Sequence, residues 1–172
     1  MERNSFECDG FCITPVTDFS IFTGVSSFAG DEDIDDFILH DAEHHYERKL
    51  AVIYSLKTLD HPDILAFASL QNDAIKLKKG CDDFSYTSFP AVKIGRLGVK
   101  SAFQRNGIGS IFINIITKFM GYANRTGCRF ITLDAYNCER TINFYLKNGF
   151  SFLKENALKS GGHTIPMYRD LL

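Results

Sequence analysis

A turn that contains two glycines, Gln104-Arg105-Asn106-Gly107-Ile108-Gly109, lies between an apolar strand that ends at Val99 and a long apolar helix. The helix is predicted over 108–123, because apolar residues recur there with the 3.6-residue period of an α-helix. The first N–H groups of a helix have no partner inside it, and the helix dipole adds positive charge at that end. Glycines allow an anion to approach this backbone closely. The turn therefore indicates a phosphate-binding site.

Two common nucleotide-binding patterns do not fit this turn. A Rossmann dinucleotide site has a third glycine three residues after the second and an acidic residue about 20 residues later. Here position 112 is Phe, and the nearest downstream acidic residue is Asp134. A Walker loop ends in Gly-Lys-Ser/Thr, whereas Gly109 is followed by Ser110-Ile111. Taken alone, the glycines could also simply shape a strand-to-helix turn.

A second strand and helix follow the first pair. Residues 130–135 are predicted as a strand, and 139–148 as a helix that contains Phe144-Tyr145 and ends at Gly149. Together with the turn, this order resembles the GNAT superfamily of acetyl-CoA-dependent N-acetyltransferases. The resemblance covers most of the chain and is strongest over 92–153. It implies an α/β fold with a mixed, mostly antiparallel sheet, a splayed parallel central strand pair and flanking helices.

The resemblance also implies a cofactor site, with acetyl-CoA bound as co-substrate between the splayed strands. The end of strand 92–99 would contact the pantetheine arm, and a backbone N–H there would stabilise the developing oxyanion. The turn would wrap the pyrophosphate, with charge added by Arg105. Asn137 would cap the second helix and touch the cofactor. The implied cofactor-binding residues are Leu97, Gly98, Val99, Gln104, Arg105, Asn106, Gly107, Ile108, Gly109, Ser110 and Asn137.

Tyr145 stands where the family often has a tyrosine beside the coenzyme A sulfur. A phenol is protonated at neutral pH, so Tyr145 would act as the general acid toward the departing thiolate. The alternative is an aromatic residue that packs against Phe144 and Phe150. One departure from the family is Cys138, seven residues before the tyrosine, where an Asn is common.

The sequence does not identify a general base. Three histidines on the predicted helix 31–49 fit a solvated face. Three carboxylates are candidates by neighbourhood alone, and each better fits a turn, solvent-exposed or capping role: Asp63, Asp73 and Asp134.

Charge is distributed unevenly along the chain. Residues 1–90 hold 7 Lys and Arg against 17 Asp and Glu, and residues 91–172 hold 12 against 4, which together give the net charge of −2. The basic half carries the turn and suits an anionic cofactor such as coenzyme A. Its basic residues are spread thinly, which favours a cofactor over RNA. The acidic run 31–36 would repel RNA unless it faces away.

A cytoplasmic protein is expected. No run of about 18 apolar residues is present, so no membrane span is predicted. The start, MERNSFECDG, lacks the pattern of a secretory signal. The five cysteines are scattered and suit free thiols; no metal site is expected.

The acceptor amine is less defined. Phe28-Ala29-Gly30, the segment 34–38 and Gly95-Arg96-Leu97-Gly98-Val99 resemble the GNAT toxins that acetylate aminoacyl-tRNA. The acceptor could equally be a small-molecule amine or a protein amine, and the transferred acyl group could be longer than acetyl. The sequence also leaves open whether the protein forms a homodimer. An alternative of another class is a non-catalytic module on the same fold that senses coenzyme A or binds a partner protein.

A single domain over 1–172 is predicted, because no internal repeat or long linker interrupts the sequence. Strands are expected over 11–16, 92–99, 150–153 and 165–169, the last two as a pair. A helix is expected over 31–49, and a hairpin from strands 49–59 and 64–70 with its turn at 60–63. Gly95 and Gly98 indicate a bulge or a close backbone approach. Residues 75–89 are interpreted as a short helix and a polar loop.

Overall fold

The computed structural model describes residues 5–76, 86–122, 127–154, 158 and 161–172. The chain divides into two compact units. The first contains residues 1–71 and 95–119, and the second contains residues 72–94 and 120–172.

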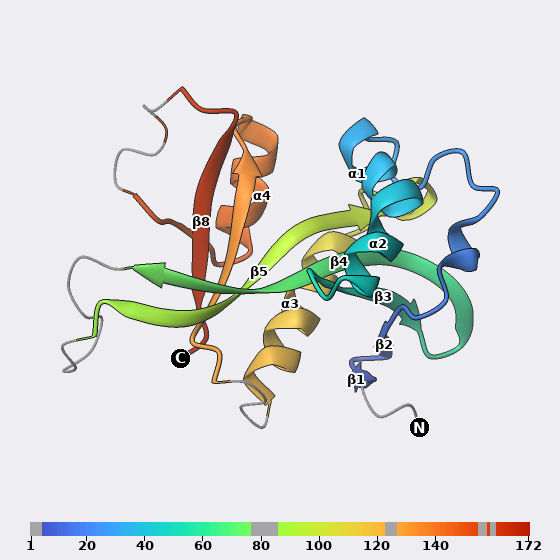
Figure 1. Ribbon diagram of the computed structural model, residues 1–172, viewed down its shortest axis with the longest axis horizontal. Helices are drawn as coiled ribbons and strands as arrows, with labels where there is room; N and C mark the ends of the chain where they lie inside the picture. Colours follow the sequence, from blue (N-terminus) through green and yellow to red (C-terminus); the bar gives the residue numbers. More distant parts are fainter. Residues whose placement is uncertain (1–4, 77–85, 123–126, 155–157, 159–160) are drawn as a thin grey trace. The chain divides into compact units, whose positions relative to one another are not determined.

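The described strands form a mixed sheet in the order β1-β2-β3-β4-β5-β6-β8-β7 (Figure 1). Strands β5 and β6 run parallel, whereas the pairs β1–β2, β2–β3, β3–β4, β6–β8 and β7–β8 are antiparallel. The predicted α/β class, with one parallel pair in a mostly antiparallel sheet, is confirmed. The strands are β1 (Phe6–Cys8), β2 (Phe11–Pro15), β3 (Val52–Thr58), β4 (His61–Lys76), β5 (Ser88–Val99), β6 (Phe130–Tyr136), β7 (Ser151–Phe152) and β8 (Thr164–Asp170).

The described helical segments lie between these strands. Within the described parts of the chain, no helix combines the length and apolar character that crossing a membrane requires. The helices are α1 (Glu32–Asp36), a π-helical segment (Phe37–Asp41), α2 (Ala42–Glu47), α3 (Ile108–Gly121) and α4 (Glu139–Lys147), with short 3₁₀ turns at Phe19–Phe22 and Ser101–Phe103.

The predicted helix 31–49 is present, but a π turn interrupts it. Asp31 caps its start by accepting a hydrogen bond from the N–H of Ile34 at 3.2 Å. The N–H of Ala42 donates to the carbonyl of Phe37, five residues back, which is the bond of a π turn. This wider turn leaves both Phe37 and Ala42 buried.

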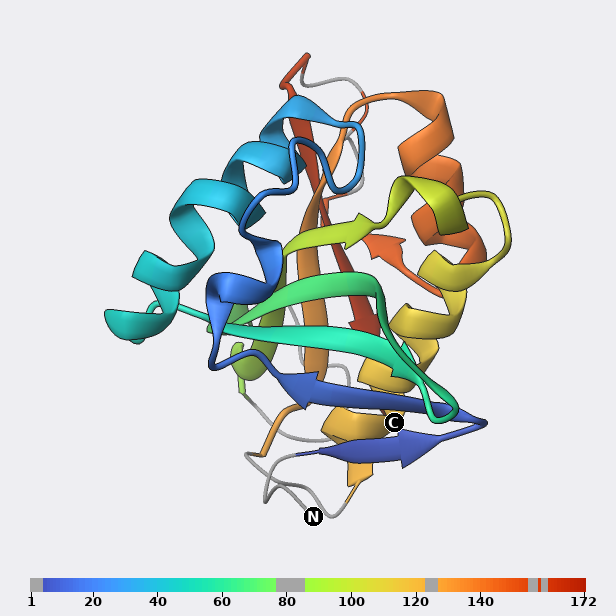
Figure 2. The same ribbon diagram turned by 90° about the vertical axis from the view of Figure 1, so that its right-hand side faces the viewer.

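Helices cover both faces of β3 and β4 within the first unit (Figure 2). On one face, Phe37 of the π segment belongs to the same buried cluster as Ile53 and Phe67. Successive residues of a strand point to opposite faces, so Tyr54 points the other way. Its ring lies 5.3 Å from that of Phe119 in α3. The first unit is therefore a three-layer arrangement of helix, sheet and helix.

Helix α3 confirms the prediction made from its apolar period. It begins at Ile108 as predicted and ends at Gly121, and the predicted last residue, 123, lies outside the described residues. Its inner side chains are almost completely shielded from solvent: Phe112, Ile113, Ile115, Ile116 and Phe119.

The predicted hairpin is formed by β3 and β4, but the predicted position of its turn is wrong. Thr58 pairs with His61, so the turn is at Leu59-Asp60 and the strand resumes at once. Strand β4 then runs to Lys76. The helix-and-loop prediction for 75–89 falls mostly on residues 77–85, outside the described part, and its described ends belong to β4 and β5.

The second unit contains the other predicted strand–helix pair. Strand β5 pairs with β6 over Ala91–Ile94 against Phe130–Leu133, and both strands run beyond this register. Helix α4 ends before Gly149, whose φ of +79° is the left-handed conformation predicted for it. Strands β7 and β8 form the expected closing pair.

Candidate functional site

The predicted phosphate turn lies between a 3₁₀ turn and the start of α3, all in the first unit. Arg105 and Gly107 have φ angles of +63° and +79°, and Asn106 between them does not share this left-handed conformation. Alternation of this kind turns successive backbone N–H groups toward one side and forms a concave anion-binding nest. The predicted residues from Gln104 to Ser110 therefore make one continuous backbone feature.

The turn has room for a phosphate group. A Cβ atom placed on Gly107 would have no other atom within 4 Å. The carbonyl of Gly107 accepts the N–H of Ile111, which leaves the preceding N–H groups of α3 without a partner inside the helix. Open space and unpaired helix N–H groups are what the pyrophosphate of coenzyme A requires, so these residues fit that cofactor.

The side chain of Gln104 has a role that the sequence did not indicate. Its amide nitrogen donates to the carbonyl of Ala29 at 2.6 Å and to that of Val99 at 3.0 Å. Ala29 is 75 residues away in sequence, so no local pattern could have revealed this contact. Gln104 thus fixes the beginning of the turn through its side chain and can offer a phosphate only its backbone.

The last residues of β5, predicted to contact the pantetheine arm, pass very close to neighbouring side chains. A Cβ atom on Gly98 would lie 2.5 Å from the ring of Phe67 and 2.7 Å from Ile34. The predicted close backbone approach is therefore confirmed at Gly98. Leu97 and Val99 on either side are only partly buried.

Gly98→Ala is expected to lower the free energy of unfolding by about 1–3 kcal/mol, because the added methyl group overpacks a buried site. Urea denaturation followed by circular dichroism measures this change. Gly121→Ala is the matched control, since no atom lies within 4 Å of its Cβ position. That helical site should gain roughly 0.5–1 kcal/mol. Equal stability of Gly98→Ala and the wild type would contradict the packing argument.

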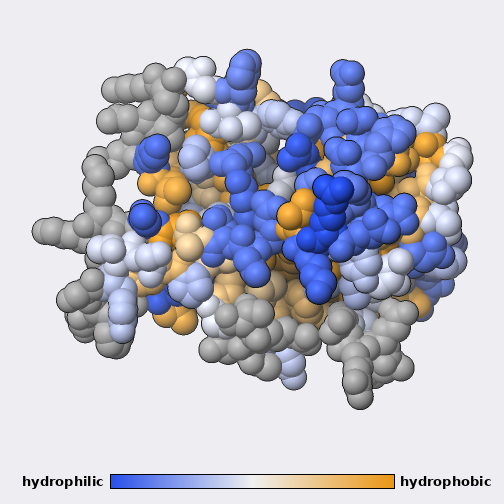
Figure 3. Space-filling view, viewed as in Figure 1, coloured by the Kyte–Doolittle hydropathy of each residue, from blue (hydrophilic) through white to orange (hydrophobic). Residues whose placement is uncertain are grey.

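An ion pair joins β5 to the acidic helix inside the first unit. The guanidinium of Arg96 faces Asp33, with Nε 2.9 Å from Oδ2 and Nη2 3.1 Å from Oδ1. The same guanidinium lies 5.7 Å from the centre of the Phe37 ring. Hydrophilic side chains cover the outer surface of α1 and α2 (Figure 3).

Tyr145 lies near the end of α4 in the second unit, between two aromatic rings. Its ring is 5.1 Å from that of Phe144 and 5.5 Å from that of Phe150. Burial raises the pKa of Tyr145 to about 12. Within the described residues, its hydroxyl has no hydrogen-bond partner. The aromatic packing therefore holds the ring, while the hydroxyl stays a protonated donor available to a ligand.

The raised pKa of Tyr145 predicts a loss of stability at high pH. Below about pH 10 the phenol is neutral in both the folded and the unfolded chain. Between there and a folded-state pKa of about 12, the unfolded chain ionises first and is stabilised. Urea unfolding at pH 9 and pH 11 should show a larger decline in the wild type than in Tyr145→Phe. Equal declines would mean that the phenol is solvated.

The prediction that Asn137 caps the start of α4 is wrong, because the cap lies one residue later. Cys138 is the N-cap of α4. The Asn137 side chain instead donates to the carbonyl of Gly162 at 2.9 Å. The thiol of Cys138 contacts Thr141 at 3.1 Å, and this hydrogen bond lowers the pKa of the thiol.

The three carboxylates considered as bases lie in different settings. Asp63 is exposed in the first unit, 3.6 Å from His61. Asp134 forms an ion pair with Lys93 at 2.6 Å. The Asp73 carboxylate accepts a hydrogen bond from the Thr132 hydroxyl and, with Asp134, lines a cavity of about 270 Å³ in the second unit. The geometry does not identify any of the three as a general base.

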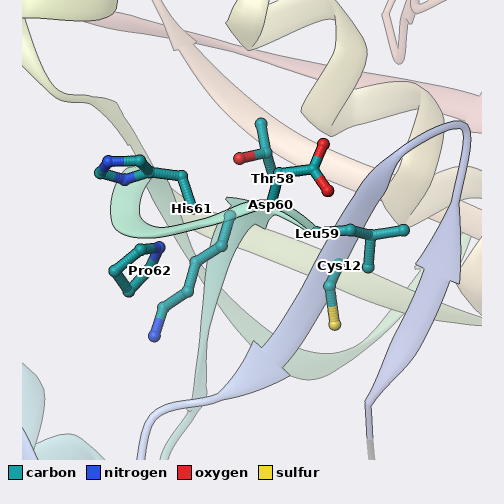
Figure 4. A pocket seen from close by; sticks show the side chains of 7 residues that line it. Cys12, Thr58, Leu59, Asp60, His61 and Pro62 are labelled. Carbon is teal, nitrogen blue, oxygen red and sulfur yellow. The ribbon is translucent and has the colours of Figure 1, made fainter.

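A larger hollow of about 440 Å³ surrounds the β3–β4 turn, away from the predicted site residues in sequence. In Figure 4 its side chains spread outward, with Cys12 and His61 at opposite ends. They do not converge on a point where a substrate could be held. Across the described residues, no three His, Cys, Asp or Glu side chains gather as metal ligands would.

Comparison with known proteins identifies a family. Residues 25–150 match the family described as "Acetyltransferase (GNAT) family". No curated protein matches the sequence.

Solved structures with the same fold include one described as a bacterial toxin and the toxin AtaT. A tyrosine-to-phenylalanine mutant of KacT has a TM-score of 0.71 and 17% identity, over 92% of this chain and 94% of that one. AtaT complexed with acetyl-methionyl-tRNAfMet has a TM-score of 0.70 and 17% identity, over 93% and 94%. AtaTR bound with AcCoA has a TM-score of 0.61 and 19% identity, over 95% of each chain. At these identities the likeness shows the fold.

Proposed function

This chain belongs to the acetyltransferase (GNAT) family, and we propose that it transfers the acetyl group of acetyl-CoA directly to an amine acceptor in a ternary complex. Acetyl-CoA is the co-substrate that this family uses. The observation that carries the proposal is the pair of left-handed residues, Arg105 and Gly107, immediately before α3. We further propose that both units form one acetyltransferase domain over 1–172.

The proposed cofactor contacts come from two stretches of the first unit. Leu97, Gly98 and Val99 offer backbone groups to the pantetheine arm and to the oxyanion that forms on attack. Residues 104–110 hold the pyrophosphate through their backbone, with charge supplied by Arg105. Asn137 remains a proposed contact from the second unit.

Tyr145 is the proposed general acid. When the neutral acceptor amine forms its bond to the acetyl carbon, the carbon–sulfur bond breaks and the sulfur keeps the electron pair. The nitrogen loses one proton, and the thiolate gains one, directly or through Tyr145 and solvent. The phenol pKa of about 12 lies well above the value of about 8.5 for an ordinary thiol. Proton transfer that runs ahead of carbon–sulfur cleavage is therefore uphill, so as general acid Tyr145 first donates a hydrogen bond as charge develops on the sulfur, and the proton follows as the thiolate leaves.

Aminoacyl-tRNA is the acceptor that we place first among the amines. AtaT, which shares the fold, was solved with acetyl-methionyl-tRNAfMet. The acidic run 31–36 also presents less of an obstacle to RNA than its sequence suggested. Asp31 caps α1 and Asp33 forms an ion pair with Arg96, so part of this negative charge is already compensated inside the first unit.

We also propose a cytoplasmic location.

A thermal-unfolding scan with acetyl-CoA tests the cofactor, with NAD and ATP as controls. At about 100 times its dissociation constant, a ligand stabilises the native state by about 2.7 kcal/mol and shifts the midpoint by several degrees. Release of free coenzyme A thiol is then followed with methionyl-tRNA, a lysine peptide and a small amine. A shift without thiol release for any amine would favour the coenzyme A-sensing module, and the absence of a shift would overturn the proposal.

A further inference from the structure

A short turn that precedes α1 is held on one edge by a single carboxylate. One oxygen of Asp35 accepts the N–H groups of Phe28 at 3.0 Å and Ala29 at 2.6 Å. The other accepts the N–H of Gly30 at 3.1 Å and the hydroxyl of Ser27 at 2.6 Å. Four donors therefore converge on one side chain, and we name the segment that supplies them the Ser27–Gly30 turn.

The other edge of the Ser27–Gly30 turn holds the beginning of the phosphate turn. The carbonyl of Phe28 accepts the N–H of Ser101 at 2.9 Å and its hydroxyl at 3.2 Å. The carbonyl of Ala29 accepts the amide nitrogen of Gln104 at 2.6 Å. Ser101 lies in the segment that joins β5 to the phosphate turn, and Gln104 is the first residue of that turn. All these residues belong to the first unit.

We propose that Asp35 is a positioning residue for the phosphate turn: it fixes the Ser27–Gly30 turn, whose carbonyls set the position of Ser101 and Gln104. Asp35 is not itself a ligand of the cofactor. This inference rests on the proposed function, because it assigns a purpose to residues that hold acetyl-CoA. It also links α1 to the cofactor site through bonds that no local sequence pattern reveals.

The negative charge of Asp35 is what suits it to this role. Partial burial opposes that charge, but hydrogen bonds from Ala29, Ser27, Phe28 and Gly30 outweigh burial and lower the pKa of the carboxyl. The peptide groups Phe28–Ala29 and Ala29–Gly30 donate their N–H groups to Asp35 on one edge. On the other edge, their carbonyls accept hydrogen bonds from the side chains of Ser101 and Gln104. Hydrogen bonds in such a chain polarise and strengthen one another.

The central test compares the acetyl-CoA affinity of Asp35→Asn with that of Asp31→Asn. Both changes remove one carboxylate charge from the start of the same helix. Asp31 only caps α1, and asparagine caps equally well. In Asp35→Asn, the introduced amide offers one acceptor oxygen in place of two. Isothermal titration of the unliganded protein should show acetyl-CoA bound about 10-fold more weakly by Asp35→Asn, and within about two-fold of wild type by Asp31→Asn.

Gln104→Leu supplies a second, independent test. It removes the hydrogen bond from Gln104 to the Ala29 carbonyl, at the end of the hydrogen-bond chain opposite to Asp35. If Asp35 acts through the Ser27–Gly30 turn, the losses of acetyl-CoA affinity in Asp35→Asn and Gln104→Leu will be less than additive in the double variant. A merely structural role would lower the urea midpoint without this coupling in affinity. In Asp35→Asn, the turnover number at saturating acetyl-CoA should stay close to that of the wild type.

The outcomes separate the two proposals. Wild-type protein that does not bind acetyl-CoA contradicts the proposed function. Wild-type protein that binds, together with Asp35→Asn that binds equally well, overturns the positioning role. If Asp35→Asn fails to fold, unchanged acetyl-CoA affinity in Gln104→Leu overturns it instead.

Discussion

Tyr145→Phe is expected to lower the turnover number on the order of 100-fold, while the dissociation constant for acetyl-CoA stays within about two-fold. Phenylalanine keeps the ring contacts with Phe144 and Phe150 and removes only the hydroxyl. The developing thiolate therefore loses its hydrogen-bond donor, and the cofactor loses little ground-state binding. Steady-state thiol release gives the turnover number, and isothermal titration gives the affinity.

Tyr168→Phe is the matched control for that experiment. Tyr168 is also a partly buried tyrosine of the second unit, and its ring lies 5.7 Å from that of Phe130. Removing its hydroxyl should leave the turnover number unchanged. Wild-type turnover in Tyr145→Phe would remove this residue from the mechanism and leave it a packing role.

Gly107→Val is expected to abolish measurable acetyl-CoA binding in a protein that still folds. A β-branched side chain would fill the open space beside Gly107 and block the approach of a phosphate to the backbone. The same change also forces valine to a φ near +79°. That strain costs roughly 1–2 kcal/mol of stability by itself, so the control must reproduce it.

Gly24→Val provides this control. Gly24 also has a φ of +79° and no atom within 4 Å of its Cβ position, but it lies far from the phosphate turn in sequence. Both variants should lose similar stability in urea, and only Gly107→Val should lose affinity in isothermal titration. Normal acetyl-CoA affinity in folded Gly107→Val would show that the turn does not hold the pyrophosphate.

The elements that could be predicted from the sequence are those set by local periodicity. Helix α3 and the left-handed Gly149 follow from an apolar period and a terminating glycine, and both are found as predicted. Strand β5 begins at Ser88, before its predicted start at Val92, and includes Pro90, a residue that is rare inside central strands. The hairpin turn was misplaced because Pro62 and Asp63 are typical turn residues, yet here they belong to β4.

The parts of the candidate site that escaped prediction depend on contacts between distant residues. The phosphate turn is local, and the left-handed φ of Gly107 agrees with the glycine pattern, whereas the left-handed φ of Arg105 was not indicated by it. The partners of Gln104 and Ser101 lie more than 70 positions away, at Ala29 and Phe28. The pKa of Tyr145 depends on burial, which a single sequence does not reveal.

The π turn at Phe37–Asp41 has a consequence for how this chain aligns with its relatives. A π turn closes an i→i+5 hydrogen bond and so holds one more residue than the α-helical turn it replaces, which lets a helix absorb one inserted residue. Relatives without the insertion would show a gap between the position of Asp35 and that of the buried Ala42. Because the π turn absorbs the extra residue, deleting one residue there would restore an α-helical turn. Asp35 and Ala42 would then keep their present partners.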